Sequence, residues 1–319
     1  MLLSNNVLLS VAAASVFIGT LYPLFMDALG MGKLSVGPPY FDAVFVPLMA
    51  LAVLMMGLGA LARWKQSSVP ELAKRVRWGF AAAAILALTV PLIFRHWTPM
   101  IALGLLLSFW VIASLVISLQ QRWSGQGPFI QRVRNQSLSY YGMQLAHLGV
   151  AVFIIGVTVV KGYETERDVR MNVGDTVDSG GYVFRFDGVR TVEGPNYRAT
   201  EAQFTVTKDG KLINELRPQK RIYNASGMPM TEAAIDKSLF RDLYVSMGEP
   251  IEGSQGAWAV RVYYKPFVVW IWLGCLLMAM GGALAISDRR YRVHSRKAKL
   301  ASDGNLPAGG AMAAGGKAS

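Results

Sequence analysis

Cysteine and histidine are both scarce in this 319-residue chain. The one cysteine, Cys275, excludes an internal disulfide and a Cys-x-x-Cys pair for thiol exchange. All three histidines lie outside the polar segment 161–265, which argues against a zinc site or a histidine-based catalyst in that segment. The apolar stretches also lack carboxylate pairs, Ser-His-Asp arrangements and glycine-rich phosphate loops, so hydrolase and nucleotide-binding classes have no support.

Charged residues are absent from the interiors of six apolar stretches. Roughly 20 mostly apolar residues are enough to cross a bilayer. The stretches are residues 7–26, 43–62, 78–94, 99–119, 138–160 and 266–286. The sequence therefore predicts an α-helical polytopic membrane protein with six transmembrane helices, five of them within residues 1–160 and the last at 266–286.

The polar segment 161–265 alternates apolar and polar residues in the manner of β-strands. Tyr182, Phe184 and Phe186 share one face, and the run Lys-Asp-Gly-Lys at 208–211 is typical of a hairpin turn. Residues 258–264 alternate again and lead directly into the last apolar stretch. We expect a small, mainly β domain inserted before the last helix, while the mixed pattern of 231–247 also fits a short helix.

The net charge of +12 is concentrated in alternate connections between the apolar stretches. Residues 63–77 carry five basic residues against one acidic, the connection after the fourth stretch adds three basic residues, and residues 287–319 carry seven basic against two acidic. Segment 161–265 is neutral, with fifteen residues of each sign. This distribution follows the positive-inside rule, so it indicates contact with membrane lipid and not with nucleic acid. We expect both termini in the cytoplasm, segment 161–265 on the other side, and a tail that is basic and then, from Ala301, disordered.

His147 is the candidate for chemistry because it lies deep in the fifth apolar stretch. An ionisable side chain in hydrocarbon is costly and faces the helix bundle, and a neutral imidazole is a good axial ligand for haem iron. Gly142, Gly149 and Gly156 recur every seven residues there, which permits close approach by a partner helix or a flat ligand. From these residues alone, a haem ligand and a histidine that makes an interhelical hydrogen bond are equally supported.

The other two histidines carry weaker signals. His96 lies in the short connection between the third and fourth stretches, where we interpret it as an interfacial side chain. His294 lies in a basic run, where contact with lipid headgroups is the simpler interpretation.

Several runs of residues, in order along the chain, resemble the carboxyl-terminal half of a known family. They are GTLYP at 19–23, SVGPPYF at 35–41, AHLGVAV at 146–152, YETERDVRM at 163–171, MTEAAID at 230–236, RDLY at 241–244 and WAVRVYYKPF at 258–267. The family is the cytochrome c-type biogenesis protein CcmF, within the haem-handling superfamily. The resemblance covers nearly the whole chain except the Gly- and Ala-rich tail.

The resemblance implies a component of the system I cytochrome c haem lyase in the bacterial inner membrane, with segment 161–265 in the periplasm. Members of the family take haem from the haem chaperone CcmE and, with CcmH, attach it to apocytochrome c. They also carry a transmembrane b-type haem, and one of its axial ligands is a histidine at the position that His147 occupies here. No catalytic residue is implied in this part of the family.

The sequence departs from the family by lacking an amino-terminal half with a Trp-rich periplasmic motif, two flanking histidines and the second transmembrane histidine. We therefore expect a fragment or a split subunit that works with the missing half, and not a complete enzyme by itself. The alternative hypothesis is a non-catalytic membrane scaffold or docking subunit without a haem of its own.

Overall fold

The computed structural model describes residues 2–61, 69–94, 96–225, 227–251, 253 and 256–288. Within these residues, six helices are long and apolar enough to cross a membrane, which confirms the predicted fold class. They are α1 (Leu2–Ala28), α2 (Pro38–Gly59), α3 (Val69–Ile93), α4 (Pro99–Trp123), α6 (Leu138–Tyr163) and α7 (Val268–Ile286). The tail for which we expect disorder, from Ala301 onward, lies outside the described residues.

Two helical features go beyond the apolar pattern. Helix α3 begins at Val69, well before the apolar stretch at 78, because backbone hydrogen bonding continues through its polar first turns. Glu71 in the first turn suits the positive end of the helix dipole and forms an ion pair of 3.2 Å with Arg75, four residues later. The short helix α5 (Phe129–Arg134) lies between α4 and α6 and was not predicted.

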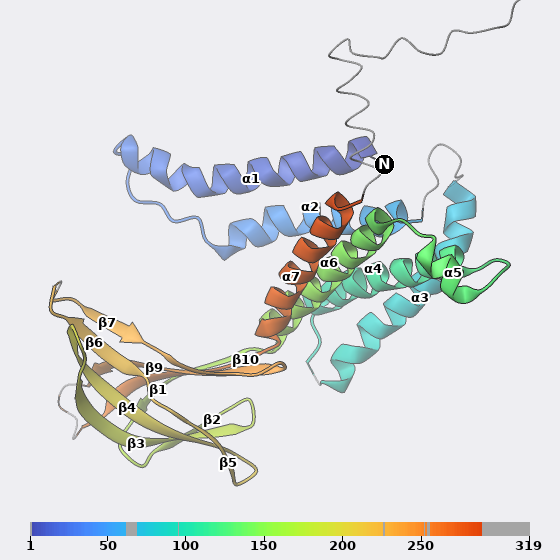
Figure 1. Cartoon of the computed structure of the whole chain (residues 1–319). Coiled ribbons are helices and arrows are strands. Elements are labelled where there is room, and N and C mark those ends of the chain that lie inside the picture. The colour runs from blue at the N-terminus through green and yellow to red at the C-terminus, as the bar shows by residue number, and fades with distance from the viewer. Residues whose placement is uncertain are drawn as a thin grey trace, which may run out of the picture.

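The membrane helices form a group in which α4 is central and α1 is peripheral. Helix α4 contacts α2, α3 and α6, while α6 and α7 share the most extensive helix–helix contact. Figure 1 shows α6 and α7 side by side, with α1 next to α2 at the edge of the group. The ends of α6 and α7 lead into the strands, so this pair connects the membrane helices to the polar segment (Figure 1).

The polar segment folds as ten antiparallel strands, which we call the β-domain (residues 165–266). One sheet has the order β1-β10-β9-β8, and the other has the order β2-β3-β4-β6-β7 with β5 also paired to β4. The chain crosses from one sheet to the other between β1 and β2 and again between β7 and β8, at opposite edges. The strands are β1 (Thr165–Met171), β2 (Thr176–Ser179), β3 (Tyr182–Glu193), β4 (Tyr197–Lys208), β5 (Lys211–Leu216), β6 (Gln219–Tyr223), β7 (Pro229–Glu232), β8 (Ala234–Lys237), β9 (Arg241–Pro250) and β10 (Trp258–Pro266).

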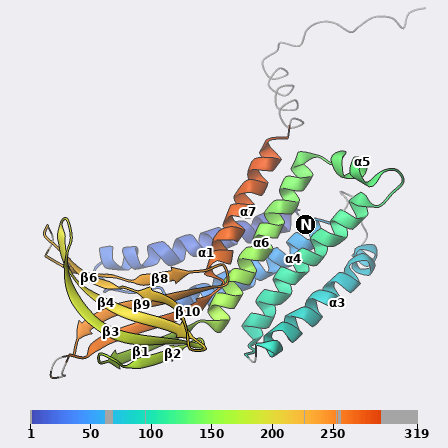
Figure 2. The same cartoon turned by 60° about the horizontal axis from the view of Figure 1, so that its bottom comes forward.

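The core of the β-domain lies between its two sheets, whose strands Figure 2 shows beside the lower end of α6. Phe184, Phe186 and Phe204 are fully buried there, and the rings of Phe186 and Phe204 stack with centroids 5.1 Å apart. Leu243 and Val262 close the core from the other sheet. The alternation at 182–186 therefore predicted the correct buried face.

The short helix that we considered for residues 231–247 is wrong. Strands β7, β8 and β9 occupy this region, and Ala233 separates the first two where the chain changes sheets. A strand of four residues shows too few alternations for a period of two to be recognised. The pairing of β8 with β9 and of β7 with β6 decides the structure instead.

Candidate functional site

Helix α6 carries the candidate ligand, and its start is well defined. The Ser137 hydroxyl accepts a hydrogen bond of 3.1 Å from the backbone N–H of Tyr140, which caps the helix. The helix then runs without interruption to Tyr163, so His147 lies well inside it.

One face of α6 packs against α7 through glycines on both helices. A Cβ atom at Gly149 would lie 2.6 Å from the backbone nitrogen of Met278, and one at Gly281 would lie 2.4 Å from that of Ala146. Gly142, Gly156 and Gly274 make equally close backbone contacts. The predicted close approach therefore serves a partner helix, α7, on this face.

His147 lies on the other side of α6, two residues and about 200° from Gly149. Its ring is half-buried, and Nδ1 lies 2.7 Å from the backbone oxygen of Met143. A carbonyl oxygen can only accept, so Nδ1 carries the proton, and in a neutral imidazole with this tautomer Nε2 has the lone pair. Among the described residues, Nε2 has no hydrogen-bond partner. The hydrogen bond within α6 thus fixes the tautomer and leaves one nitrogen free to bind a metal ion.

A buried polar cluster lies one turn of helix from His147, toward α4. The Gln144 side-chain nitrogen lies 3.0 Å from the hydroxyl of Ser118 and 2.5 Å from that of Tyr140, and the two hydroxyls are 3.0 Å apart. The other end of the carboxamide is buried without a partner among the described residues. A glutamine inside an apolar stretch was the signal for this cluster, and our sequence reasoning did not use it.

The structure does not bring His96 near His147. The backbone oxygen of His96 accepts a hydrogen bond of 3.0 Å from the Tyr163 hydroxyl, and the two rings contact edge to face. Tyr163 lies sixteen residues beyond His147 on α6, which corresponds to about 24 Å at 1.5 Å per residue. His294 lies outside the described residues, so no second imidazole is placed beside His147.

A metal site built by the chain alone is not evident in the described part of the molecule. No group of three or more His, Cys, Asp or Glu side chains converges there. Near His147 the described chain offers one imidazole as a metal ligand. One imidazole, half-buried and with a fixed tautomer, fits one axial position of a haem iron.

Strand β1 continues directly from α6 and is paired with β10 over its whole length. This pairing makes most of the charged run at 163–170 part of a sheet and not a solvated stalk. The Arg261 guanidinium donates hydrogen bonds to both carboxylate oxygens of Asp168, which holds the pKa of that carboxyl below its usual value. Tyr263 donates a hydrogen bond of 3.0 Å to Glu166, so charged side chains on both strands reinforce the pairing.

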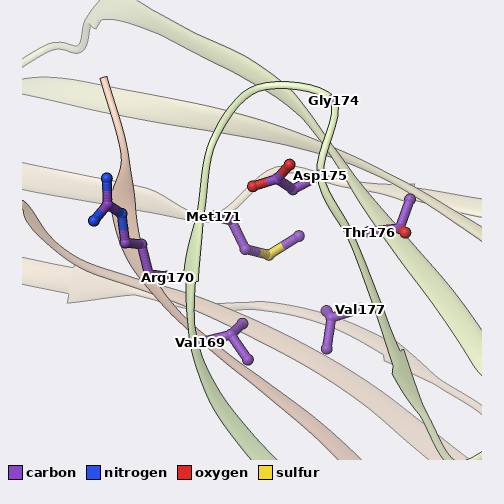
Figure 3. A pocket seen from close by; sticks show the side chains of 7 residues that line it. All are labelled: Val169, Arg170, Met171, Gly174, Asp175, Thr176 and Val177. Carbon is purple, nitrogen blue, oxygen red and sulfur yellow. The ribbon is translucent and has the colours of Figure 1, made fainter. Parts of the chain in front are cut away.

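An open surface pocket of about 420 Å³ lies beside the turn between β1 and β2. Figure 3 shows Val169 and Val177 facing each other across it, while the Arg170 side chain points away. The remaining lining residues are Met171, Gly174, Asp175 and Thr176. The pocket contains one carboxylate and no histidine or cysteine, so it has neither the acid–base pair nor the ligand set of a catalytic centre.

Comparison with known proteins agrees with this architecture. The family model described as CcmF C-terminal beta-sandwich matches residues 162–266. The cytochrome c-type biogenesis protein CcmF of Pseudomonas aeruginosa is 48% identical over 293 residues, which are 92% of this chain and 44% of that protein. The protein of the same name from Escherichia coli is 43% identical over 293 residues, with the same two shares.

A solved structure, named cytochrome c heme lyase CcmF, shares the fold. Its TM-score is 0.68 at 20% sequence identity, and the match covers 89% of this chain and 44% of that one. The chain thus spans less than half the length of the relatives that it matches.

Proposed function

Since this chain is homologous to the carboxyl-terminal half of the CcmF proteins, we propose that it is a component of a cytochrome c haem lyase. In this proposal His147 supplies one axial ligand to a b-type haem within the membrane. The β-domain serves as a docking module for the proteins that deliver haem and receive it.

The free Nε2 atom of His147 is the observation that carries the ligand assignment. The hydrogen bond from Nδ1–H to Met143 belongs to α6 itself, so it needs no other helix to hold the ring. A metal-bound histidine usually donates such a hydrogen bond from the ring nitrogen that does not bind the metal. An interhelical hydrogen bond, the competing role for this histidine, has no counterpart among the described residues.

A bound haem would supply a redox-active iron to the complex. The part of this chain is to bind and orient that group: the α6–α7 contact fixes the helix, and Met143 fixes the tautomer of His147. Attachment of haem joins a thiol to a vinyl group, which depends on orientation and redox poise. We assign this chain no proton transfer in that step, and in this proposal it contributes to the enzyme by binding and orienting the haem.

The partners in this proposal follow from the incomplete coverage of the relatives. A polypeptide that corresponds to their remaining length would complete the membrane region and supply the second ligand. The haem chaperone CcmE, CcmH and apocytochrome c would meet the complex on the side of the β-domain. The distribution of basic residues supports a bilayer orientation with both termini in the cytoplasm and the β-domain in the periplasm.

The test is a haem spectrum of the chain purified after co-expression with the missing half. We expect the b-type absorbance to be present in the wild type and lost in His147→Ala. Adding imidazole to His147→Gly should restore part of it, because free imidazole can occupy the vacated axial position. Unchanged absorbance in His147→Ala would refute the ligand assignment.

His96→Ala is the matched control, since His96 lies at the end of the helices and contacts Tyr163. Its spectrum should equal that of the wild type. The thermal midpoint of each variant in detergent shows whether a lost spectrum reflects a lost ligand or a lost fold. If no variant of the complex binds haem, the non-catalytic scaffold becomes the better description.

A further inference from the structure

The turn between β8 and β9 presents two large apolar side chains. Leu239 and Phe240 are 51% and 56% exposed, respectively. Leaving such a pair in water forgoes the free energy that burial of large apolar side chains normally gives. The turn lies where the β-domain meets α7, beside the end of β10 (Figure 2).

Hydrogen bonds and an ion pair hold the backbone of this turn in place. The backbone N–H of Ser238 donates to the carbonyl oxygen of Arg241 at 2.9 Å and to the carboxylate of Asp242 at 3.3 Å. The guanidinium of Arg241 pairs with Asp236 on β8. The position of Leu239 and Phe240 at the tip of this turn is therefore set by the fold.

Aromatic contacts place the turn at the level of the first turn of α7. The ring of Phe240 lies 5.8 Å from that of Phe267 and 6.5 Å from that of Trp270, and the backbone N–H of Phe267 donates to the Phe240 carbonyl at 3.1 Å. Phe267 precedes α7, and Trp270 lies in its first turn. Aromatic residues at the end of a span mark the boundary between hydrocarbon and headgroups.

We propose that Leu239 and Phe240 insert into the bilayer leaflet on the side of the β-domain. The occupant is lipid because Phe240 packs against Phe267 and Trp270, so the exposed pair lies at the level where α7 enters the bilayer on this side. The proposal does not depend on haem binding or on the role of His147.

The insertion gives the β-domain a third point of attachment to the membrane. The first two are covalent: β1 follows α6 through Glu164, and β10 leads into α7 through Phe267. Because β1 and β10 are paired neighbours, these two attachments lie close together and leave the domain free to tilt about them. A lipid contact at the β8–β9 turn restricts that tilt and fixes the height of the domain above the bilayer.

The experiment measures the depth of a nitroxide at position 239 in the full chain. Cys275 is replaced by alanine, Leu239→Cys is labelled, and the protein is reconstituted in nanodiscs of phosphatidylcholine and phosphatidylglycerol. Collision rates with oxygen and with a water-soluble nickel chelate are then compared. Val173→Cys is the matched control, since Val173 is apolar and 62% exposed but lies beyond the far end of β1, which is about 26 Å along the strand from the end of α6.

We expect the ratio of oxygen to nickel collisions to be several-fold higher at position 239 than at position 173. Equal ratios would place the turn in water and overturn the proposal. Protection of position 239 from both reagents would also overturn it, because protein would then cover the turn. Since both substituted side chains are exposed, neither change removes a core contact, and circular dichroism of the labelled proteins confirms the fold.

Discussion

The β-domain and the membrane helices differ in how completely they bury their own side chains. The β-domain encloses a continuous core in which Phe184, Phe204 and Val262 are fully buried. Among the membrane helices, 44% of the most apolar part of α4 is buried, whereas only 11% is buried in α1 and in α7. The β-domain thus has the packing of a complete unit, and the helices have the packing of an array that lipid or further protein must cover.

Polar side chains show the same difference. Within the described residues, the buried side-chain atoms without a partner are Arg132 Nε, Gln144 Oε1 and Trp270 Nε1, and all three lie in helices. The buried Glu201 of the β-domain, by contrast, accepts hydrogen bonds from Arg190 and Gln219. Gln144 and Trp270 lie in membrane helices, where a polar group without a partner in hydrocarbon is costly, so the membrane region has the greater need of a partner.

The test with the largest expected effect is to express the β-domain without the membrane helices. Residues 162–266 expressed alone should be soluble and unfold in a single cooperative step in urea, because Thr165 and Tyr264 are paired and hold the two cut ends together. Phe204→Ala in this domain should lower the free energy of unfolding by about 3–5 kcal/mol. An aggregated or molten domain would show that the β-domain also depends on the membrane helices.

A pair of adjacent glycines in α7 tests whether the helices are closely packed where they do meet. A Cβ atom at Gly281 would lie 2.4 Å from the backbone nitrogen of Ala146, whereas one at Gly282 would meet nothing within 4 Å. Gly281→Ala should therefore lower the thermal midpoint in detergent, because backbone atoms cannot yield as a flexible side chain can.

Gly282→Ala is the control for helix propensity, which alone favours alanine by up to about 1 kcal/mol. It should leave the midpoint unchanged or raise it. If both substitutions have the same effect, the close contact between α6 and α7 does not contribute to stability.

The sequence located the membrane helices and the buried face of one strand, but it missed other strands of the β-domain. Hydropathy and charge located all six spans, and the alternation at 182–186 identified the buried face of β3, because each signal is repeated over many residues. Strands β7 and β8 were missed because each has only four residues, too few to show a period of two.

The sequence likewise predicted some features of the candidate site and not others. His147 is identifiable from sequence because a histidine in an apolar stretch is unusual, and the spacing of the glycines predicted a close contact. The identity of that contact as α7, and the hydrogen bond of Nδ1 to Met143, depend on three-dimensional packing and on the rotamer of one side chain. Neither leaves a pattern in the sequence.

The smallest effect that we expect concerns Glu201, whose completed hydrogen bonds distinguish the β-domain from the helices. Burial by itself raises the pKa of this carboxyl, but hydrogen bonds from Gln219 and Arg190 outweigh it and hold the pKa below its usual value. A lowered pKa in the folded state means that the stabilisation is present above the unfolded value, about 4.3, and is lost as the pH falls through the folded value. Glu201→Gln should therefore lower the free energy of unfolding by about 1–2 kcal/mol at pH 7, an amount kept small because the Arg190 side chain is 63% exposed.

Urea denaturation at pH 7 and at pH 3 measures this loss of stability, and the difference between wild type and variant should shrink at the lower pH. Arg198 and Glu193 provide the control, since both are exposed and Glu193→Gln should change stability little at either pH. A Glu201→Gln effect that is equal at both pH values would mean that its shape, and not its charge, stabilises the domain.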